Sequence, residues 1–174
     1  EILIAPPTSG TRDAWNSLVM NKGCSKEAKS LFGDKSKKEC AKMREDGYAV
    51  EAGENDTLIV QKLAANPDAY GFFGYSYYLA NKDKIKAAAI NGVKPSLEGI
   101  QDYSYPIARP LFFYAKKAHV GVVPGLKEFL DAFTSKKAMG SRGYLTDIGL
   151  VPLASDKYKV TRTAAKDLVT INLK

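Results

Sequence analysis

Short apolar runs alternate with amphipathic stretches along most of this chain. Apolar runs predict strands at residues 2–5, 48–52, 70–75, 86–90 and 107–116. Helical spacing of apolar positions predicts helices at residues 10–21, 58–64, 77–80, 96–100 and 126–133, with a final helix from Val160 onwards. Pro110 cannot donate a ladder hydrogen bond, so the start of the last predicted strand should lie at a sheet edge or in a crossover between lobes. Strands that alternate with helices indicate an α/β layered fold.

The stretch from Pro6 to Trp15 carries the chemistry that stands out most. An apolar run leads into two prolines, and Ser9, Gly10, Thr11 and Arg12 then open a helix. The first turn of a helix offers unpaired amides and a partial positive charge, so it can receive an anion. Hydroxyls and a forked guanidinium would add donors. The alternative is an ordinary helix cap in which Thr8 or Ser9 satisfies one orphan amide.

Composition places the chain among globular proteins of 174 residues, large enough for one domain or two small lobes. Its net charge of +7 is uneven. Residues 1–87 carry 13 basic and 12 acidic side chains (+1), whereas residues 88–174 carry 13 and 7 (+6). The lysines are scattered singly or in pairs, without interleaved arginines, which favours a solvated surface over a nucleic-acid groove.

Two cysteines, Cys24 and Cys40, leave two alternatives open. A bridge between them would close a loop of about 15 residues, worth roughly 3 kcal/mol in the chain-entropy model, and would require an oxidising compartment. Two buried free thiols are the other alternative. A structural zinc site is not expected, because the single histidine, His119, is far away in sequence.

Several classes of function find no support in the residue pattern. No Ser–His–Asp order, paired-carboxylate motif or metal spacing points to catalysis, so we expect no enzyme and no cofactor. The glycine-rich pieces lack the lysine and the spacing of a nucleotide-binding loop. No run of about 18 apolar residues could span a membrane. No leader precedes Glu1, so we expect the chain to be processed or to be a piece of something longer.

Taken in order, several segments resemble the periplasmic phosphate-binding proteins of ABC transporters. The matching segments cover nearly the whole chain; they are residues 6–14, 44–47, 51–56 with 58–63, 73–76, 104–106 with 109–111, 124–129, 143–145 and 149–152. The resemblance implies an α/β periplasmic-binding-protein type II lobe, a mixed sheet flanked by helices, together with the returning C-terminal part of the other lobe. It implies a second lobe at residues 1–106, and a crossover strand with first-lobe helices at residues 107–174.

The resemblance also implies a ligand, a site and a compartment. In that family a Ser-Gly-Thr run at a helix start binds phosphate, which transfers to Ser9, Gly10 and Thr11. Many members carry an arginine where this chain has Ala5, so we expect Arg12 to supply the charge, with Thr8 and Asp13 in support. The proton-accepting aspartate that separates phosphate from sulfate in the family has no counterpart here, so we expect this chain to hold half of the site.

The implied biology is that of a non-enzymatic importer component. We expect a periplasmic monomer, with no signal peptide in this chain, that delivers inorganic phosphate to ABC permease subunits and meets the membrane only through them. A disulfide between Cys24 and Cys40 fits that compartment and is predicted. The alternatives are a receptor for another tetrahedral oxyanion such as sulfate, and a basic nucleic-acid-binding domain.

Overall fold

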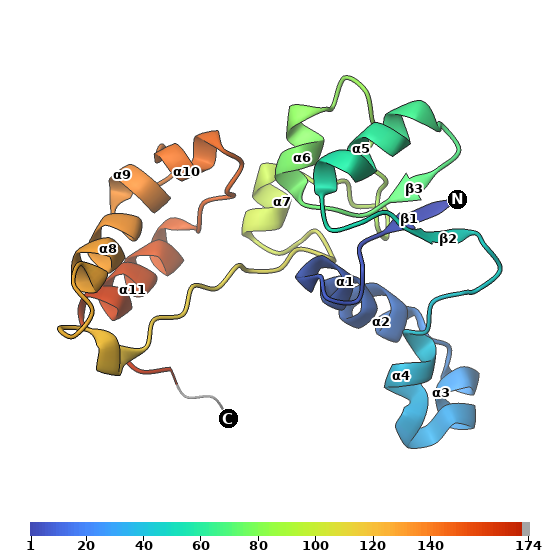
Figure 1. The fold of residues 1–174 in the computed structure, drawn as a ribbon, viewed down its shortest axis with the longest axis horizontal. Helices are drawn as coiled ribbons and strands as arrows, with labels where there is room; N and C mark the ends of the chain where they lie inside the picture. The colour runs from blue at the N-terminus through green and yellow to red at the C-terminus, as the bar shows by residue number, and fades with distance from the viewer. Residues whose placement is uncertain (172–174) are drawn as a thin grey trace. The chain divides into compact units, whose positions relative to one another are not determined.

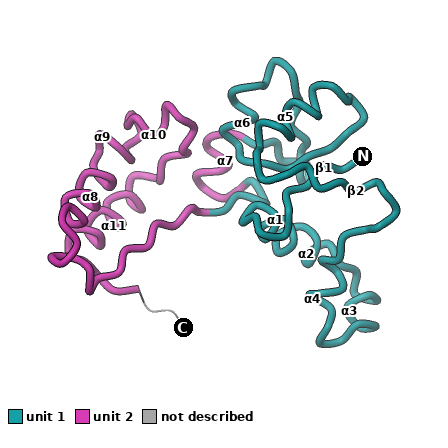
Figure 2. Tube along the Cα trace, in the orientation of Figure 1, with its two compact units in different colours: residues 1–95, 105–109 teal, residues 96–104, 110–174 magenta. Residues whose placement is uncertain are grey.

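A computed structural model describes residues 1–171, and it divides into two compact units. Unit 1 comprises residues 1–95 and 105–109, and unit 2 comprises residues 96–104 and 110–174 (Figure 2). Each unit is described by itself below. The assignment of residues 1–106 and 107–174 to two lobes stays a prediction.

Unit 1 is built on a small parallel sheet in the order β2-β1-β3. Its strands are β1 (Ile2–Ile4), β2 (Ala49–Glu51) and β3 (Tyr70–Gly71). Leu3 lies opposite Val50 on one side and Gly71 on the other. The expected mixed sheet is therefore an all-parallel one in the described residues, because every connection between these strands passes through at least one helix and returns in the same direction.

The helices of unit 1 follow the predicted order. They are α1 (Gly10–Trp15), a π-helical turn η1 (Asn16–Met20), α2 (Asn21–Gly23), α3 (Lys26–Phe32), a 3-10 turn η2 (Gly33–Lys35), α4 (Ser36–Cys40), α5 (Asp56–Ala65) and α6 (Tyr75–Ala80). In Figure 1, α5 and α6 lie on one side of the strands, and α1 with α2 on the other. Asn55 is the N-cap of α5, and its Oδ1 accepts a hydrogen bond from the amide of Thr57 at 2.9 Å.

The core of unit 1 lies between the sheet and α5. Leu3 and Ile59 are almost fully buried, and Val50, Leu63 and Phe73 pack against them. A side chain at Gly71 would meet Ile59 at 3.0 Å and Leu63 at 3.1 Å, so glycine lets β3 approach α5 closely. Tight packing here fixes where each strand ends, and therefore where each following helix begins.

Helices α3 and α4 form a lysine-rich hairpin that the structure closes with a disulfide between Cys24 and Cys40. The two Cα atoms are 5.8 Å apart, within the usual range for a bridge.

Unit 2 contains α7 (Leu97–Gln101), a 3-10 turn η3 (Lys117–His119), α8 (Leu126–Phe133), α9 (Lys136–Met139), α10 (Tyr144–Asp147) and α11 (Ser155–Lys166). The predicted amphipathic helix at 126–133 is present with the same bounds. Arg162 of α11 donates to the carbonyl oxygen and the carboxylate of Asp131 and to Thr134 Oγ1, which joins α11 to α8.

The strand expected at residues 70–75 is shorter, because β3 ends at Gly71 and Tyr75 already belongs to α6. Three further expected elements differ from the structure. Residues 86–90 form no strand, and Ile90 instead pairs with Val93 across a turn in which Asn91 and Gly92 have positive φ. The final helix begins at Ser155 and ends at Lys166, before Leu168, whose φ is positive.

The third difference is the expected crossover strand at 107–116, which is irregular in the described residues. Phe113 packs on Phe129 and Phe133 of α8, with ring centroids 5.6 and 5.2 Å apart, but Phe112 and Tyr114 are largely exposed. A strand needs a neighbour that supplies ladder hydrogen bonds, and among the described residues none lies beside this segment. Its β-forming composition alone does not make it a strand.

In the part of the chain that the structure describes, no helix combines the length and the apolar character needed to cross a membrane.

Candidate oxyanion site

Three helices of unit 1 begin at one edge of the sheet. β1 leads to α1, β2 leads to α5, and β3 leads to α6. Since the strands are parallel, their carboxyl ends meet at the same edge, which is where open α/β sheets bind ligands. The predicted residues Ser9 to Arg12 therefore lie where ligand binding is expected for this architecture.

Ser9 is the N-cap of α1. Its backbone is extended, and its Oγ accepts a hydrogen bond from the Thr11 amide at 3.2 Å. Ser9 is therefore a helix cap, as the alternative interpretation predicts. Capping uses its oxygen as an acceptor, so its hydroxyl proton can still be donated to a ligand. Capping and oxyanion binding are compatible at this residue.

The first turn of α1 has open space and available donors. A Cβ placed on Gly10 would meet no atom within 4 Å. The Asp13 amide donates to the Ser9 carbonyl at 3.1 Å, and the Thr11 amide is used by the cap. For the residues that the structure describes, no hydrogen bond engages the amides of Gly10 and Arg12 outside the helix, as expected for a first turn.

Arg12 is a buried cation, with 8% of its surface exposed. Its Nη1 donates to the carbonyl of Ala5 at 3.1 Å, and its Nε donates to Oδ1 of Asn16 at 3.3 Å. Within residues 1–171, no carboxylate lies within ion-pair distance of this guanidinium. A buried charge without a counter-charge is costly, and an anion bound beside it would lower that cost.

The two residues expected to support the site have different surroundings. Thr8 donates to the Glu54 carboxylate at 2.5 Å, which ties the start of α1 to the loop before α5. Asp13 is exposed and does not hold Arg12, because adjacent residues on a helix point in different directions.

Asn16 is the residue that reasoning from the sequence missed. It lies four positions after Arg12, the spacing at which helical side chains meet. The spacing of four residues could have identified Asn16 as a partner of Arg12, but the adjacent carboxylate of Asp13 is the stronger acceptor and was preferred.

A concavity of about 420 Å³ lies along the exposed face of α1 and the turns that follow it. It is lined by Gly10, Asp13, Ala14, Asn16, Ser17, Asn21 and Arg109. Of the four residues predicted to bind phosphate, Gly10 alone is among them. Oδ1 of Asn21 is shielded from solvent and has no hydrogen-bond partner in the described part of the chain.

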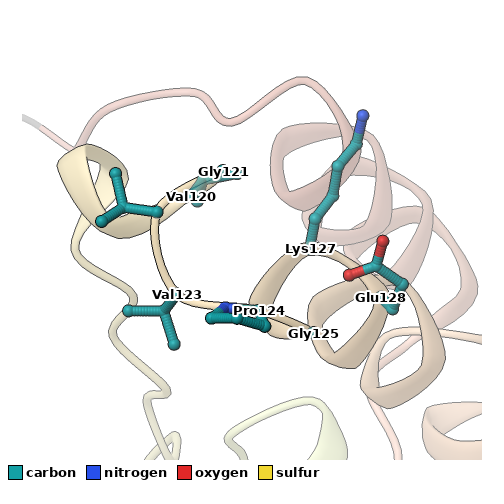
Figure 3. A pocket seen from close by; sticks show the side chains of 8 residues that line it. Val120, Gly121, Val123, Pro124, Gly125, Lys127 and Glu128 are labelled. Atoms are coloured by element: carbon teal, nitrogen blue, oxygen red, sulfur yellow. The ribbon is translucent and has the colours of Figure 1, made fainter.

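A second concavity, of about 380 Å³, lies in unit 2 on the loop before α8 (Figure 3). Its lining runs from Val120 to Glu128 and contains none of the predicted site residues. In Figure 3 the side chains of Lys127 and Glu128 extend from α8, and the rest of the lining is valine, proline and glycine. It offers an anion no buried cation comparable to Arg12.

Within residues 1–171, no group of three histidine, cysteine or carboxylate side chains is placed to hold a metal ion. This edge of the sheet offers hydrogen-bond donors and the positive charge of Arg12, together with the carboxylate of Glu54 beside Thr8.

Comparison with known proteins agrees with this fold. Residues 2–137 match the family model described as a PBP superfamily domain. Protein SphX of Synechococcus elongatus is 34% identical over 88% of this chain and 40% of its own length. A phosphate-binding protein PstS of Staphylococcus saprophyticus is 27% identical over 92% of this chain and 52% of its own length.

A crystal structure described as a possible phosphate binding protein from Planctomyces limnophilus shares the fold. Its TM-score is 0.60 at 24% identity, over 98% of this chain and 54% of that one. The chain thus spans about half the length of the relatives it matches.

Proposed function

This chain belongs to the PBP superfamily, and on that premise we propose that unit 1 contributes one half of a binding site for inorganic phosphate. The proposed ligands are Ser9, Gly10, Thr11 and Arg12. Hydroxyls, first-turn amides and one guanidinium would bind the phosphate oxygens. Binding is the whole of the proposed activity, and no bond of the ligand is broken.

The observation that carries the proposal is Arg12, which is buried beside the α1 N-terminus and whose hydrogen-bond acceptors within residues 1–171 are neutral oxygens. Its guanidinium donates to the carbonyl of Ala5, the position where the family resemblance implies an arginine in many members. Arg12 can thus supply, from its own place in α1, a positive charge close to Ala5. A tetrahedral oxyanion supplies the negative charge and the acceptors that this arrangement lacks.

Glu54 bears on which anion the site would accept. Its carboxylate lies on the loop beside Thr8, and it would repel an anion bound at Ser9. A protonated oxygen of phosphate could donate to a carboxylate, whereas sulfate carries no proton near neutral pH. The selectivity itself is proposed to lie mainly with the other half of the family's site.

The wider role follows from the relatives. Proteins named phosphate-binding are among the matches, and we propose that this chain serves the same step for an ABC-type importer, in the periplasm and as a monomer. Residues 1–106 would form the second lobe of such a receptor, and residues 107–174 would belong to the first.

The test is calorimetry on the natural protein, with all of the polypeptide that carries these residues. Phosphate should bind and sulfate should not. Equal binding of both anions would support the alternative of a general oxyanion receptor, and DNA binding that weakens steeply with salt would support the nucleic-acid alternative.

A further inference from the structure

We infer that Asn16 is a positioning residue that aims the Arg12 guanidinium at the bound anion while leaving its charge uncompensated. The inference rests on the proposed function and adds a residue that the sequence resemblance does not supply. It starts from the contact between Nε of Arg12 and Oδ1 of Asn16, at 3.3 Å.

The chemistry of the pair fixes its orientation. Arginine can only donate, so the amide of Asn16 must turn its oxygen towards Nε. Asn16 lies one helical turn after Arg12, and its own backbone amide donates to the carbonyls of Arg12 and Asp13. The acceptor is therefore held by the same backbone that carries the arginine.

Two contacts together define the plane of the guanidinium. Nε is occupied by Asn16, and one N–H of Nη1 is occupied by the carbonyl of Ala5. Of the five N–H groups of arginine, both of Nη2 and the second of Nη1 remain. A ligand would then bind through the remaining N–H groups of Nη1 and Nη2, because Nε is occupied by Asn16.

Both acceptors of Arg12, the side-chain amide of Asn16 and the carbonyl of Ala5, are neutral. Arg44 pairs with Asp46, and Arg162 pairs with Asp131, so each of these arginines meets a carboxylate. Arg12 is more buried than either, yet it is held by an amide oxygen and a backbone carbonyl. An aspartate at position 16 would hold the guanidinium more firmly but would cancel the charge that an anion needs.

The position of Asn16 in the fold agrees with this role. It begins the π-helical turn that follows α1, and such turns are frequent at functional sites. It also lines the concavity beside Gly10, so it lies next to the first turn rather than on a remote surface.

The test compares Asn16→Leu and Asn16→Asp in the natural protein, with inorganic phosphate as the probe and calorimetry as the readout. Removing the acceptor in Asn16→Leu should weaken phosphate binding by roughly three- to tenfold, the range of one hydrogen bond. Asn16→Asp keeps the shape and the acceptor, so the unliganded protein should melt no lower than wild type, yet phosphate binding should weaken by at least as much. If Asn16 only stabilised the fold, Asn16→Asp would not keep the melting temperature and lower the phosphate affinity at the same time.

Two controls make the outcome specific. Asn81→Leu removes another asparagine side chain, whose amide donates to the Tyr77 carbonyl at the end of α6, and should leave the affinity unchanged. In an Arg12→Lys background, which has no Nε–H to hold, Asn16→Leu should cost nothing further. Wild-type affinity in both Asn16 variants would overturn the inference while the phosphate proposal stands, whereas a wild-type protein that binds no phosphate would overturn both.

Discussion

The guanidinium of Arg12 donates to the carbonyl of Ala5 at 3.1 Å, and both residues are buried. This contact places the one buried arginine of the described residues at the end of β1, where the strand delivers the chain to the α1 N-terminus. The charge in the proposed site is therefore positioned by the backbone of the sheet as well as by the helix that carries it.

Replacing Arg12 with alanine should weaken phosphate binding by roughly 1.5–3 kcal/mol, the worth of a hydrogen bond to a charged group. That is about a 10- to 150-fold rise in Kd, measured by calorimetry. Arg44→Ala is the matched control, because Arg44 is exposed and paired with Asp46. If Arg12→Ala bound phosphate as wild type does, the essential charge would have to lie elsewhere.

Replacing Gly10 with alanine should separate folding from binding. A Cβ at this position has open space and a permissive backbone, so the melting temperature should be unchanged or slightly higher. The same Cβ would stand where a phosphate oxygen must approach the first-turn amides, so affinity should fall by roughly tenfold or more, as for a lost charged hydrogen bond.

Gly23→Ala serves as the control for Gly10, since Gly23 also has no atom within 4 Å of the added Cβ. It should alter neither melting nor affinity to a comparable degree. Unchanged phosphate binding in Gly10→Ala would remove Gly10 from the proposed ligands.

The disulfide predicts a measurable loss of stability on removal. Replacing both Cys24 and Cys40 with serine should lower the free energy of unfolding by roughly 3 kcal/mol, since the bridge closes a loop with a sequence separation of 16. Chemical denaturation measures this change. Mass spectrometry of the protein before and after reduction should show a gain of two hydrogen atoms, and a mass that does not change would mean that the thiols are free.

Asp46 predicts a pH dependence outside the proposed site. Its hydrogen bonds with Arg44 hold the pKa of this carboxyl below its ordinary value. A depressed pKa in the folded state contributes stability at higher pH, and that contribution is lost as the pH falls through the folded pKa. Carboxyl NMR titration should find the pKa of Asp46 rising towards the ordinary value in Arg44→Ala.

Asp102 is the internal reference for that titration. The backbone amide of Ser104 lowers the pKa of Asp102, so Arg44→Ala should leave it as it was. Equal changes in the pKa of Asp46 and of Asp102 would mean that the substitution disturbs the whole protein, and would contradict a local effect of Arg44 on Asp46.

The sequence pattern predicted those elements that are determined by residues close together in the chain. Helix α8 has the predicted bounds, because Leu126, Phe129, Leu130 and Phe133 repeat at helical spacing and Gly125 precedes them. The start of α1 was predicted for the same reason, since Ser9 is a good cap residue.

Features that depend on distant partners could not be predicted from local pattern. The contact between Thr8 and Glu54 joins residues 46 positions apart, and no spacing rule suggests it. The segment 107–116 has strand composition but no neighbouring strand in the described residues, and pairing is a property of two segments. The burial of Arg12 likewise follows from the packing of β1 and α1 together, not from its own sequence position.

The central claim is that this fold presents a phosphate half-site at the N-terminus of α1. The most direct measurement is a calorimetric titration of the natural protein with phosphate and, separately, with sulfate, at one pH and one salt concentration. The account predicts saturable binding of phosphate, loss of most of that affinity in Arg12→Ala, and no binding of sulfate. Equal binding of the two anions, or phosphate binding that does not depend on Arg12, would contradict it.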